Sequence, residues 1–368
     1  MVKISVVIPV YNVEEYLEES ILCLFNQTFE DFELICVNDG SKDNSLDILK
    51  KFAKIDPRVI IINKENGGCG SARNRGLDEA KGDYIYFFDP DDYIVPNAFE
   101  DLYNNITNNK SDFVIFKFAL FMEGEPVDYS RPTFDLDEIF KDADFNNFTF
   151  TYKDVKRHVL NSSFAPWTKL YRADFLNKYD DFRFDLGVAF DDVPFHVKSM
   201  LRAKKISFAP DYYYHYRYAN PNSVNNTSSN GIDIMKIIDI VEDFLKKEKY
   251  FDELKNEFFC FKINHITIYM ISTNSDEYFK LAKQKLLELN EDDLKEIPKD
   301  LLKKYYLIVE SNSLKEYKSK LRASSIKEDA TKIFNNITGK NKENTLKKEI
   351  QSSNIWKSAK IRLKRFKN

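Results

Sequence analysis

The sequence is poor in cysteine and has no long apolar run. Its 4 cysteines show no paired spacing and no Cys-x-x-Cys motif, which argues against a disulfide framework and against a zinc site. No apolar stretch reaches the roughly 18 residues that a membrane-spanning helix requires. The first apolar segment, at 4–10, is too short for the core of a signal peptide, so we expect a cytoplasmic protein.

The chain also lacks a marked excess of charge of one sign. Among its 368 residues, 31% are charged, and the net charge is −4. This balance gives no reason to expect nucleic-acid binding. The hydrophobic content of 43% predicts a soluble protein with a substantial core, and the length allows one large domain with an appendage or two domains.

The N-terminal third contains a regular alternation of strand and helix patterns. Apolar runs predict strands at 3–10, 32–37, 59–62, 84–88 and 113–118. Helical patterns lie between them, the clearest at 14–26, 72–80 and 97–108. This alternation with short connections predicts an α/β fold, with a mostly parallel sheet flanked by helices.

The regularity lapses after residue 118. An acidic stretch at 121–147 reads as a solvated excursion, and an aromatic run at 212–218 predicts a further strand. From residue 232 the chain becomes rich in lysine and glutamate with helical patterning. We therefore expect a first domain at 1–230, with halves at 1–118 and 119–230, and a helical region at 231–353.

The acidic cluster Asp89-Pro90-Asp91-Asp92 directly follows the apolar strand at 84–88. Ligands of open α/β sheets bind beyond the carboxyl ends of the strands. Neighbouring carboxylates repel one another unless a cation neutralises them, and Mg²⁺ or Mn²⁺ commonly shares its coordination shell with substrate phosphates. The cluster therefore predicts a site for a divalent metal and a phosphate compound. A plain surface turn is the alternative, but it does not account for the apolar strand.

Four motifs in order make this assignment more specific. They are Ile-Pro-Val-Tyr-Asn at 8–12, Val-Asn-Asp-Gly-Ser at 37–41, Asn-Gly-Gly at 66–68 followed by Ala-Arg-Asn-Arg-Gly at 72–76, and the acidic cluster. Together they resemble the family 2 glycosyltransferases, inverting enzymes with a GT-A fold that use nucleotide-diphosphate sugars. The resemblance spans residues 1 to about 225. It implies a Rossmann-like GT-A domain, with a nucleotide-sugar half at 1–118 and an acceptor half at 119–230.

The resemblance assigns the donor contacts. It implies that Asp39 accepts a hydrogen bond from a uracil ring, the alternative being a helix cap or Asx turn. The further donor contacts are Pro9, Tyr11, Asn66, Gly68, Arg73, Asp89, Asp91 and Arg217. The glycine-rich turn permits close backbone approach, and the helix after it offers N–H groups to anions. Arg73 could instead pair with Asp89 or its neighbours, and Arg217 precedes a loop containing Ser223 that could close over the diphosphate.

By the same resemblance, Asp89 and Asp91 hold a Mn²⁺ or Mg²⁺ ion that offsets charge on the departing diphosphate. Inversion also requires a general base for the acceptor hydroxyl. The acidic pair of the family is usually Glu-Asp and is Asp191-Asp192 here. We expect Asp192 to be the base and Asp191 to be the alternative or to orient the acceptor, although a helix N-cap would need one acid of the pair.

Two residues lie where the family has its acceptor-side loop. Trp167 could stack on an acceptor sugar, or could belong to the core, and Lys169 lies in the same loop.

The segment 354–368 has six basic residues, no acid, and apolar residues near helical spacing. It predicts an interfacial helix at anionic lipid, hence a peripheral position at the cytoplasmic membrane face; a basic tail, solvated or docked on the acidic body, is equally compatible.

These features predict a metal-dependent inverting glycosyltransferase. It would move a sugar from a nucleotide donor, most simply a UDP-sugar, to a hydroxyl of a cell-surface glycan or a lipid-linked acceptor. One alternative is a catalytically silent nucleotide-sugar-binding module. A nucleotidyltransferase is less consistent, because the segment at 11–15 after the first strand is acidic rather than a basic glycine-rich loop.

Overall fold

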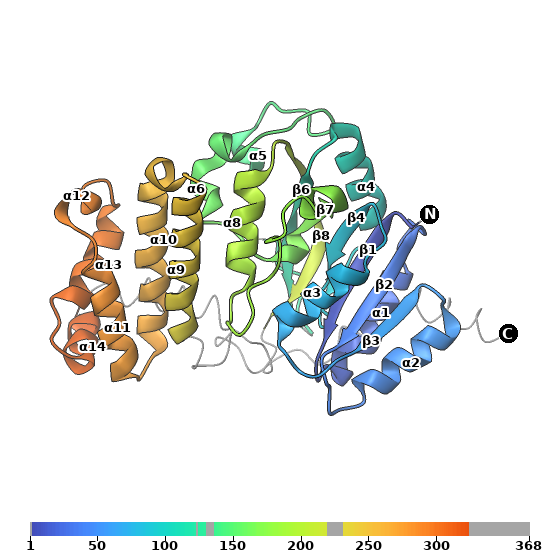
Figure 1. Cartoon of the computed structure of the whole chain (residues 1–368), viewed down its shortest axis with the longest axis horizontal. Helices are drawn as coiled ribbons and strands as arrows, with labels where there is room; N and C mark the ends of the chain where they lie inside the picture. The colour runs from blue at the N-terminus through green and yellow to red at the C-terminus, as the bar shows by residue number, and fades with distance from the viewer. Residues whose placement is uncertain (1, 123, 130–135, 219–230, 324–368) are drawn as a thin grey trace.

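A computed structural model of the chain describes residues 2–122, 124–129, 136–218 and 231–323. The segment predicted to bind membranes, 354–368, lies outside these residues, as does Ser223. Figure 1 shows a sheet with helices on both sides, and a helical region at one end of the molecule. The α/β architecture with a helical C-terminal region is therefore confirmed.

In the described part of the chain, eight strands form one mixed sheet in the order β3-β2-β1-β4-β7-β6-β8-β5. Their bounds are β1 Ile4–Val10, β2 Phe32–Asn38, β3 Val59–Asn63, β4 Tyr84–Phe87, β5 Tyr93–Ile94, β6 Phe113–Phe121, β7 Lys169–Arg172 and β8 Ile206–Arg217. Strands β1 to β4 are mutually parallel, as are β6 and β8, whereas β7 runs antiparallel between β4 and β6. The mostly parallel sheet follows the prediction, but the insertion of β7 does not. A strand of four residues is too short to show a period.

Helices cover both faces of this sheet. In the first domain they are α1 Glu14–Phe25, α2 Ser45–Ile55, α3 Cys69–Glu79, α4 Ala98–Asn109, α5 Leu136–Ile139, α6 Lys156–Val159, α7 Ala173–Leu176 and α8 Asp192–Arg202, with 3₁₀ turns η1 Tyr152–Val155 and η2 Pro166–Thr168. Alternate residues of β1 face opposite sides. Val6 and Ile8 share an apolar cluster with α1, α2 and α4. Val7 shares another with α8 and the C-terminal helices.

The C-terminal helices extend this second cluster. They are α9 Gly231–Lys247, α10 Phe251–Ser272, α11 Asp276–Leu286, α12 Glu291–Leu294, α13 Lys299–Val309 and α14 Leu314–Ala323. One continuous set of buried apolar side chains runs from Val7 and Phe87 in the sheet to Tyr317 in α14. The predicted boundary near Gly231 coincides with the first described residue of α9 and stays a prediction.

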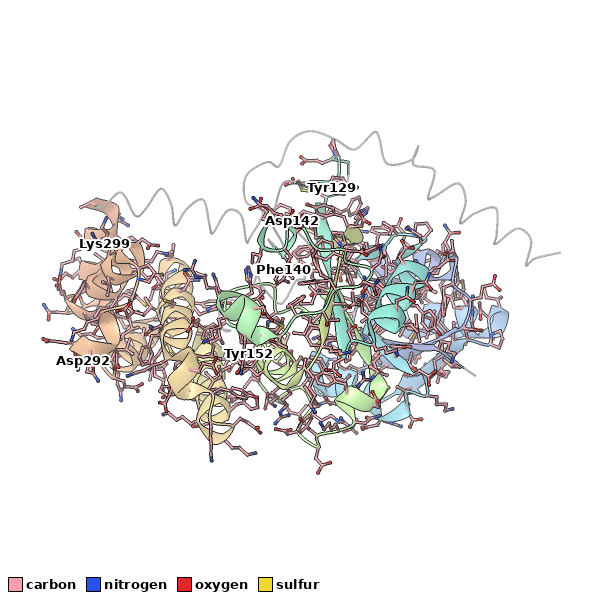
Figure 2. All side chains as sticks on the ribbon, turned by 90° about the horizontal axis from the view of Figure 1, so that it is seen from above. Tyr129, Phe140, Asp142, Tyr152, Asp292 and Lys299 are labelled. Carbon is pink, nitrogen blue, oxygen red and sulfur yellow. The ribbon has the colours of Figure 1, made fainter. Side chains whose placement is uncertain are left out.

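Polar contacts reinforce the junction between the two parts. Arg202 at the end of α8 pairs with Asp181 at 2.7 Å and with Glu248, beyond α9, at 2.9 Å. The Tyr152 hydroxyl donates to Glu253 of α10 at 2.9 Å. Figure 2 shows Tyr152 where the helical region meets the first domain, with Asp292 and Lys299 at the far end. Within the described ranges, no helix combines the length and apolarity needed to cross a membrane.

Candidate active site

The acidic cluster lies just beyond the carboxyl end of β4, and its last member is structural. Asp92 is fully buried; it accepts hydrogen bonds from the Tyr214 hydroxyl and from the backbone N–H of Arg217, both at 2.6 Å. Burial raises the pKa of Asp92 well above its usual range. Asp92 therefore anchors the turn to β8, and the ligand role predicted for Asp89 and Asp91 stays a prediction.

Arg217 has a different position from the one that the motif pattern predicts. Its guanidinium is buried; Nε donates to the backbone carbonyl of Asp91 at 2.7 Å and Nη2 to the Tyr93 hydroxyl at 2.8 Å. The same group lies over the ring of Tyr16, 4.6 Å from its centroid. Arg217 therefore holds the acidic turn in place, and its predicted contact with the donor stays a prediction.

Arg73 connects the two halves of the candidate site. This buried side chain of α3 donates from Nη2 to Asp89 at 2.8 Å, and its Nη1 lies 3.6 Å from the carboxylate of Asp191. Its guanidinium also lies over the ring of Phe184, 5.3 Å from the centroid. The sequence left open a pairing of Arg73 with Asp89, and the structure shows that pairing. One cation thus links an acid predicted for the donor to an acid predicted for the acceptor.

The pair Asp191 and Asp192 stands at the start of α8. Asp191 occupies the N-cap position but makes no side-chain capping hydrogen bond, so capping does not account for it. Burial raises its pKa to about 7, while the nearby Arg73 acts in the opposite direction. Burial also raises the pKa of Asp192, whereas the positive charges of Arg73 and Lys169 lower it. A carboxylate with a pKa near the working pH suits a general base.

A glycine in α3 allows Asp191 to come this close. A Cβ placed on Gly70 would lie 2.1 Å from Oδ2 of Asp191, a distance that no side chain tolerates. Gly70 belongs to the Gly-Gly-x-Gly turn, and the sequence linked that turn to the donor alone. A glycine in the first turn of a helix costs stability, so the presence of Gly70 could have indicated that another segment approaches the helix closely at this position.

The glycine-rich loop closes around Asp39. The carboxylate of Asp39 is buried and accepts backbone N–H groups of Gly67 at 3.0 Å and Gly68 at 2.8 Å. Lys64, which the sequence analysis did not single out, forms an ion pair with it at 2.5 Å, and Asn66 donates to its backbone carbonyl at 3.1 Å. The structure therefore gathers Asp39, Asn66 and Gly68 at one edge. Asp39 is no cap of α2.

The remaining donor residues lie at the same edge. Pro9 is buried in β1, in register with Val37 at the end of β2. Tyr11 follows β1 and is exposed over 44% of its surface, so its ring is open to a ligand. The carboxyl ends of parallel strands meet at one sheet edge, which is why residues from three motifs converge here.

The two predicted acceptor contacts are buried instead. Trp167 is 6% exposed, and its ring stacks on Tyr214 with centroids 4.3 Å apart and meets Phe118 edge-on at 4.8 Å. Lys169 is fully buried, and its ammonium donates to the carbonyl of Ala165 at 2.9 Å. These contacts place Trp167 in the core, as the alternative had it. Lys169 supports the loop before β7 from inside, and its predicted contact with the acceptor stays a prediction.

The donor set for a metal consists of two carboxylates. Among the described residues, no group of three or more His, Cys, Asp or Glu side chains gathers as a complete metal cage. Asp89 and Asp91 alone are a suitable partial shell for Mg²⁺ or Mn²⁺, because these ions take oxygen ligands and complete their coordination with phosphates and water. The residues therefore fit a metal shared with a diphosphate.

Comparisons with known proteins show the family to which the chain belongs. The family model described as glycosyl transferase family 2 matches residues 5–180. The chain is 34% identical over 250 residues to glycosyltransferase GlyG of Streptococcus pneumoniae serotype 4, a match that covers 66% of this chain and 79% of GlyG. It is 33% identical over 285 residues to the poly(ribitol-phosphate) beta-glucosyltransferase of Bacillus spizizenii, covering 73% of this chain and 42% of that enzyme.

The extent of these matches differs between relatives. Two of the strongest matches cover 30% and 82% of the other protein's length. Among solved structures, residues 1–349 of S. aureus TarS in complex with UDP-GlcNAc are similar, with a TM-score of 0.52 and 23% identity. That match covers 84% of this chain and 91% of the other. At this identity the likeness concerns the fold.

Proposed function

Because this chain belongs to glycosyl transferase family 2 and is thus a glycosyltransferase by family, we propose that it transfers a sugar from a UDP-sugar to a hydroxyl of a cell-surface glycan, with inversion at the anomeric carbon. The poly(ribitol-phosphate) glucosyltransferase supports a surface-glycan acceptor, and the UDP-GlcNAc complex of TarS has the same fold. The observation that carries the proposal is the acid pair at the start of α8, linked through Arg73 to the acidic turn after β4.

The donor would bind at the carboxyl edge of the sheet. Asp39 would accept a ring N–H of the base after its contacts with Lys64 or with the glycine-rich loop rearrange. Asp89 and Asp91 would hold a Mn²⁺ or Mg²⁺ ion together with the diphosphate, and the bound ion would stabilise the negative charge of the leaving group. Arg217 and Asp92 keep the acidic turn fixed for that purpose.

The acceptor hydroxyl would be activated by the acid pair. Inversion by direct displacement requires one base to take the hydroxyl proton as the oxygen attacks the anomeric carbon. Asp191 and Asp192 are both candidates, since each has a raised pKa and neither serves as a side-chain cap. Lys169 supports the neighbouring loop from inside, and its charge favours the ionised form of Asp192.

Calorimetric titration with UDP, GDP, CDP and dTDP, each with and without Mn²⁺, tests the donor site. We expect metal-dependent binding of UDP, lost in Asp91→Asn and kept in Asp47→Asn, an exposed aspartate of α2. Release of UDP from UDP-hexoses in water then separates an enzyme from a silent binding module, because a module would bind without turnover. Absence of binding to every diphosphate would contradict the proposal.

A further inference from the structure

Helix α10 supports both loops that border the acid pair. Phe164 lies in the loop before β7. The centroid of its ring is 6.0 Å from that of Phe261 and 5.8 Å from that of His265. Phe190, directly before Asp191, contacts the ring of Tyr269 at 5.4 Å. Phe261, His265 and Tyr269 are spaced four residues apart, so they share one face of the helix. That face looks toward the acceptor half of the first domain.

The loop before the acid pair is held in an unusual conformation. Phe190 has φ +63°, in the left-handed region that large side chains rarely adopt. Its ring contact with Tyr269 stabilises this conformation, as does the hydrogen bond from the N–H of Ala189 to Asp233 of α9 at 3.1 Å. Contacts with the C-terminal helices thus help to fix the position of the backbone at Asp191 and Asp192.

Tyr269 also lies within electrostatic reach of the acid pair. Burial raises the pKa of its phenol, and the charge of Asp192 raises it further. The side chain nevertheless remains partly exposed. A phenol that stays protonated beside a candidate base can donate a hydrogen bond to a hydroxyl, and its ring can stack on the apolar face of a sugar.

The residues that the motifs assigned to the acceptor do not offer these contacts, because Trp167 and Lys169 are buried. We propose that the end of this α10 face that carries Tyr269 forms one side of the acceptor site, and that Tyr269 contacts the acceptor sugar next to Asp192. This inference rests on the proposed function. It gives the helical region, to which the motifs assigned no role, a part in acceptor specificity.

The test compares Tyr269→Ala and Tyr269→Phe with Tyr306→Ala, a half-exposed tyrosine of α13, as the matched control. Release of UDP is measured from the UDP-hexose that the wild type hydrolyses fastest, in water and with p-nitrophenyl glycosides as acceptor probes. We expect Tyr269→Ala to raise the KM for the probe about tenfold, whereas Tyr269→Phe keeps the ring contact with Phe190 and should leave the UDP affinity and the water hydrolysis within about twofold. Tyr269→Phe, which keeps the ring, should show a smaller rise, and Tyr306→Ala none.

Two results would overturn the proposal. One is an unchanged KM for the probe in Tyr269→Ala. The other is a parallel fall of melting temperature, UDP affinity and water hydrolysis in Tyr269→Phe, which would make Tyr269 a purely structural residue. Failure of the proposed function is visible separately, since the wild-type protein would then release no UDP from any UDP-hexose.

Discussion

Gly70 and Asp191 come from segments more than a hundred residues apart, yet a single methyl group on Gly70 would overlap the Asp191 carboxylate. Gly70→Ala should therefore displace the acid pair without unfolding the chain. A shift of about 1 Å at a reacting group can lower turnover about a hundredfold. Initial rates of UDP release measure the effect. Asp78→Ala, at an exposed position near the other end of α3, is the control that should retain activity, and equal rates for both variants would contradict the close contact.

Replacing each acid of the pair identifies the base. Loss of a general base lowers turnover by about 10²–10⁴-fold. We expect one of Asp191→Asn and Asp192→Asn to show this loss with an unchanged affinity for UDP, and the other to change mainly the KM for the acceptor. Calorimetry and steady-state rates measure the two quantities. Losses below threefold in both variants would remove the pair from catalysis.

The pH dependence of turnover should report Asp191 if it is the base. A base must be ionised, and because the pKa of Asp191 is raised to about 7, turnover should fall as the pH drops below 7. Arg73 lowers this pKa, so Arg73→Gln should move the acidic limb to higher pH. A pH–rate profile of UDP hydrolysis measures both. An acidic limb near pH 4 in the wild type would show that Asp191 does not control the rate.

The same pKa shift affects stability. A carboxyl group whose pKa rises on folding contributes stability that is complete below its unfolded pKa and is lost as the pH rises through its folded pKa. For Asp191 that range extends from 3.8 to about 7. Above pH 7, Asp191→Asn should therefore stabilise the protein by on the order of 2 kcal/mol. Urea unfolding at pH 5 and pH 8 tests this, and a gain at pH 5 alone would have the wrong sign.

Trp167 provides a test of core packing against ligand contact. Truncation of a buried aromatic side chain costs about 3–5 kcal/mol, so Trp167→Ala should lower the free energy of unfolding by that amount. The cost should be the same with and without an acceptor sugar. If the variant kept its stability but lost acceptor affinity, the ring would be a sugar platform after all.

The fold was accessible from sequence because β1, β2 and β4 are almost completely buried and show as apolar runs. The positions of the acidic cluster and of Asp39 were accessible for a related reason: each follows a strand whose carboxyl end is fixed by the sheet. β7 was not, since its place between β4 and β6 depends on pairing across more than eighty residues rather than on a local pattern.

Side-chain roles were harder to predict than positions. The local sequence does not distinguish a tryptophan that stacks on Tyr214 from one that binds a sugar. The position of the Trp167 ring depends on β8, which contributes Tyr214. Arg217 carries a charge that suits a diphosphate, but its hydrogen bonds to the Tyr93 hydroxyl and to the Asp91 carbonyl depend on residues far away in the sequence. The roles of Gly70 and Tyr269 depend on contacts with distant segments, which a single sequence does not show.

The apolar cluster that runs unbroken from the sheet into α14 has an evolutionary consequence. Substitutions in α10 that adapt the enzyme to a new acceptor also alter the packing that holds the catalytic loops. Divergence in substrate choice is thereby coupled to foldability, and compensating changes in α8 and α9 should accompany it. A chimera that exchanges the helical region between relatives would have to carry α8 with it to remain folded.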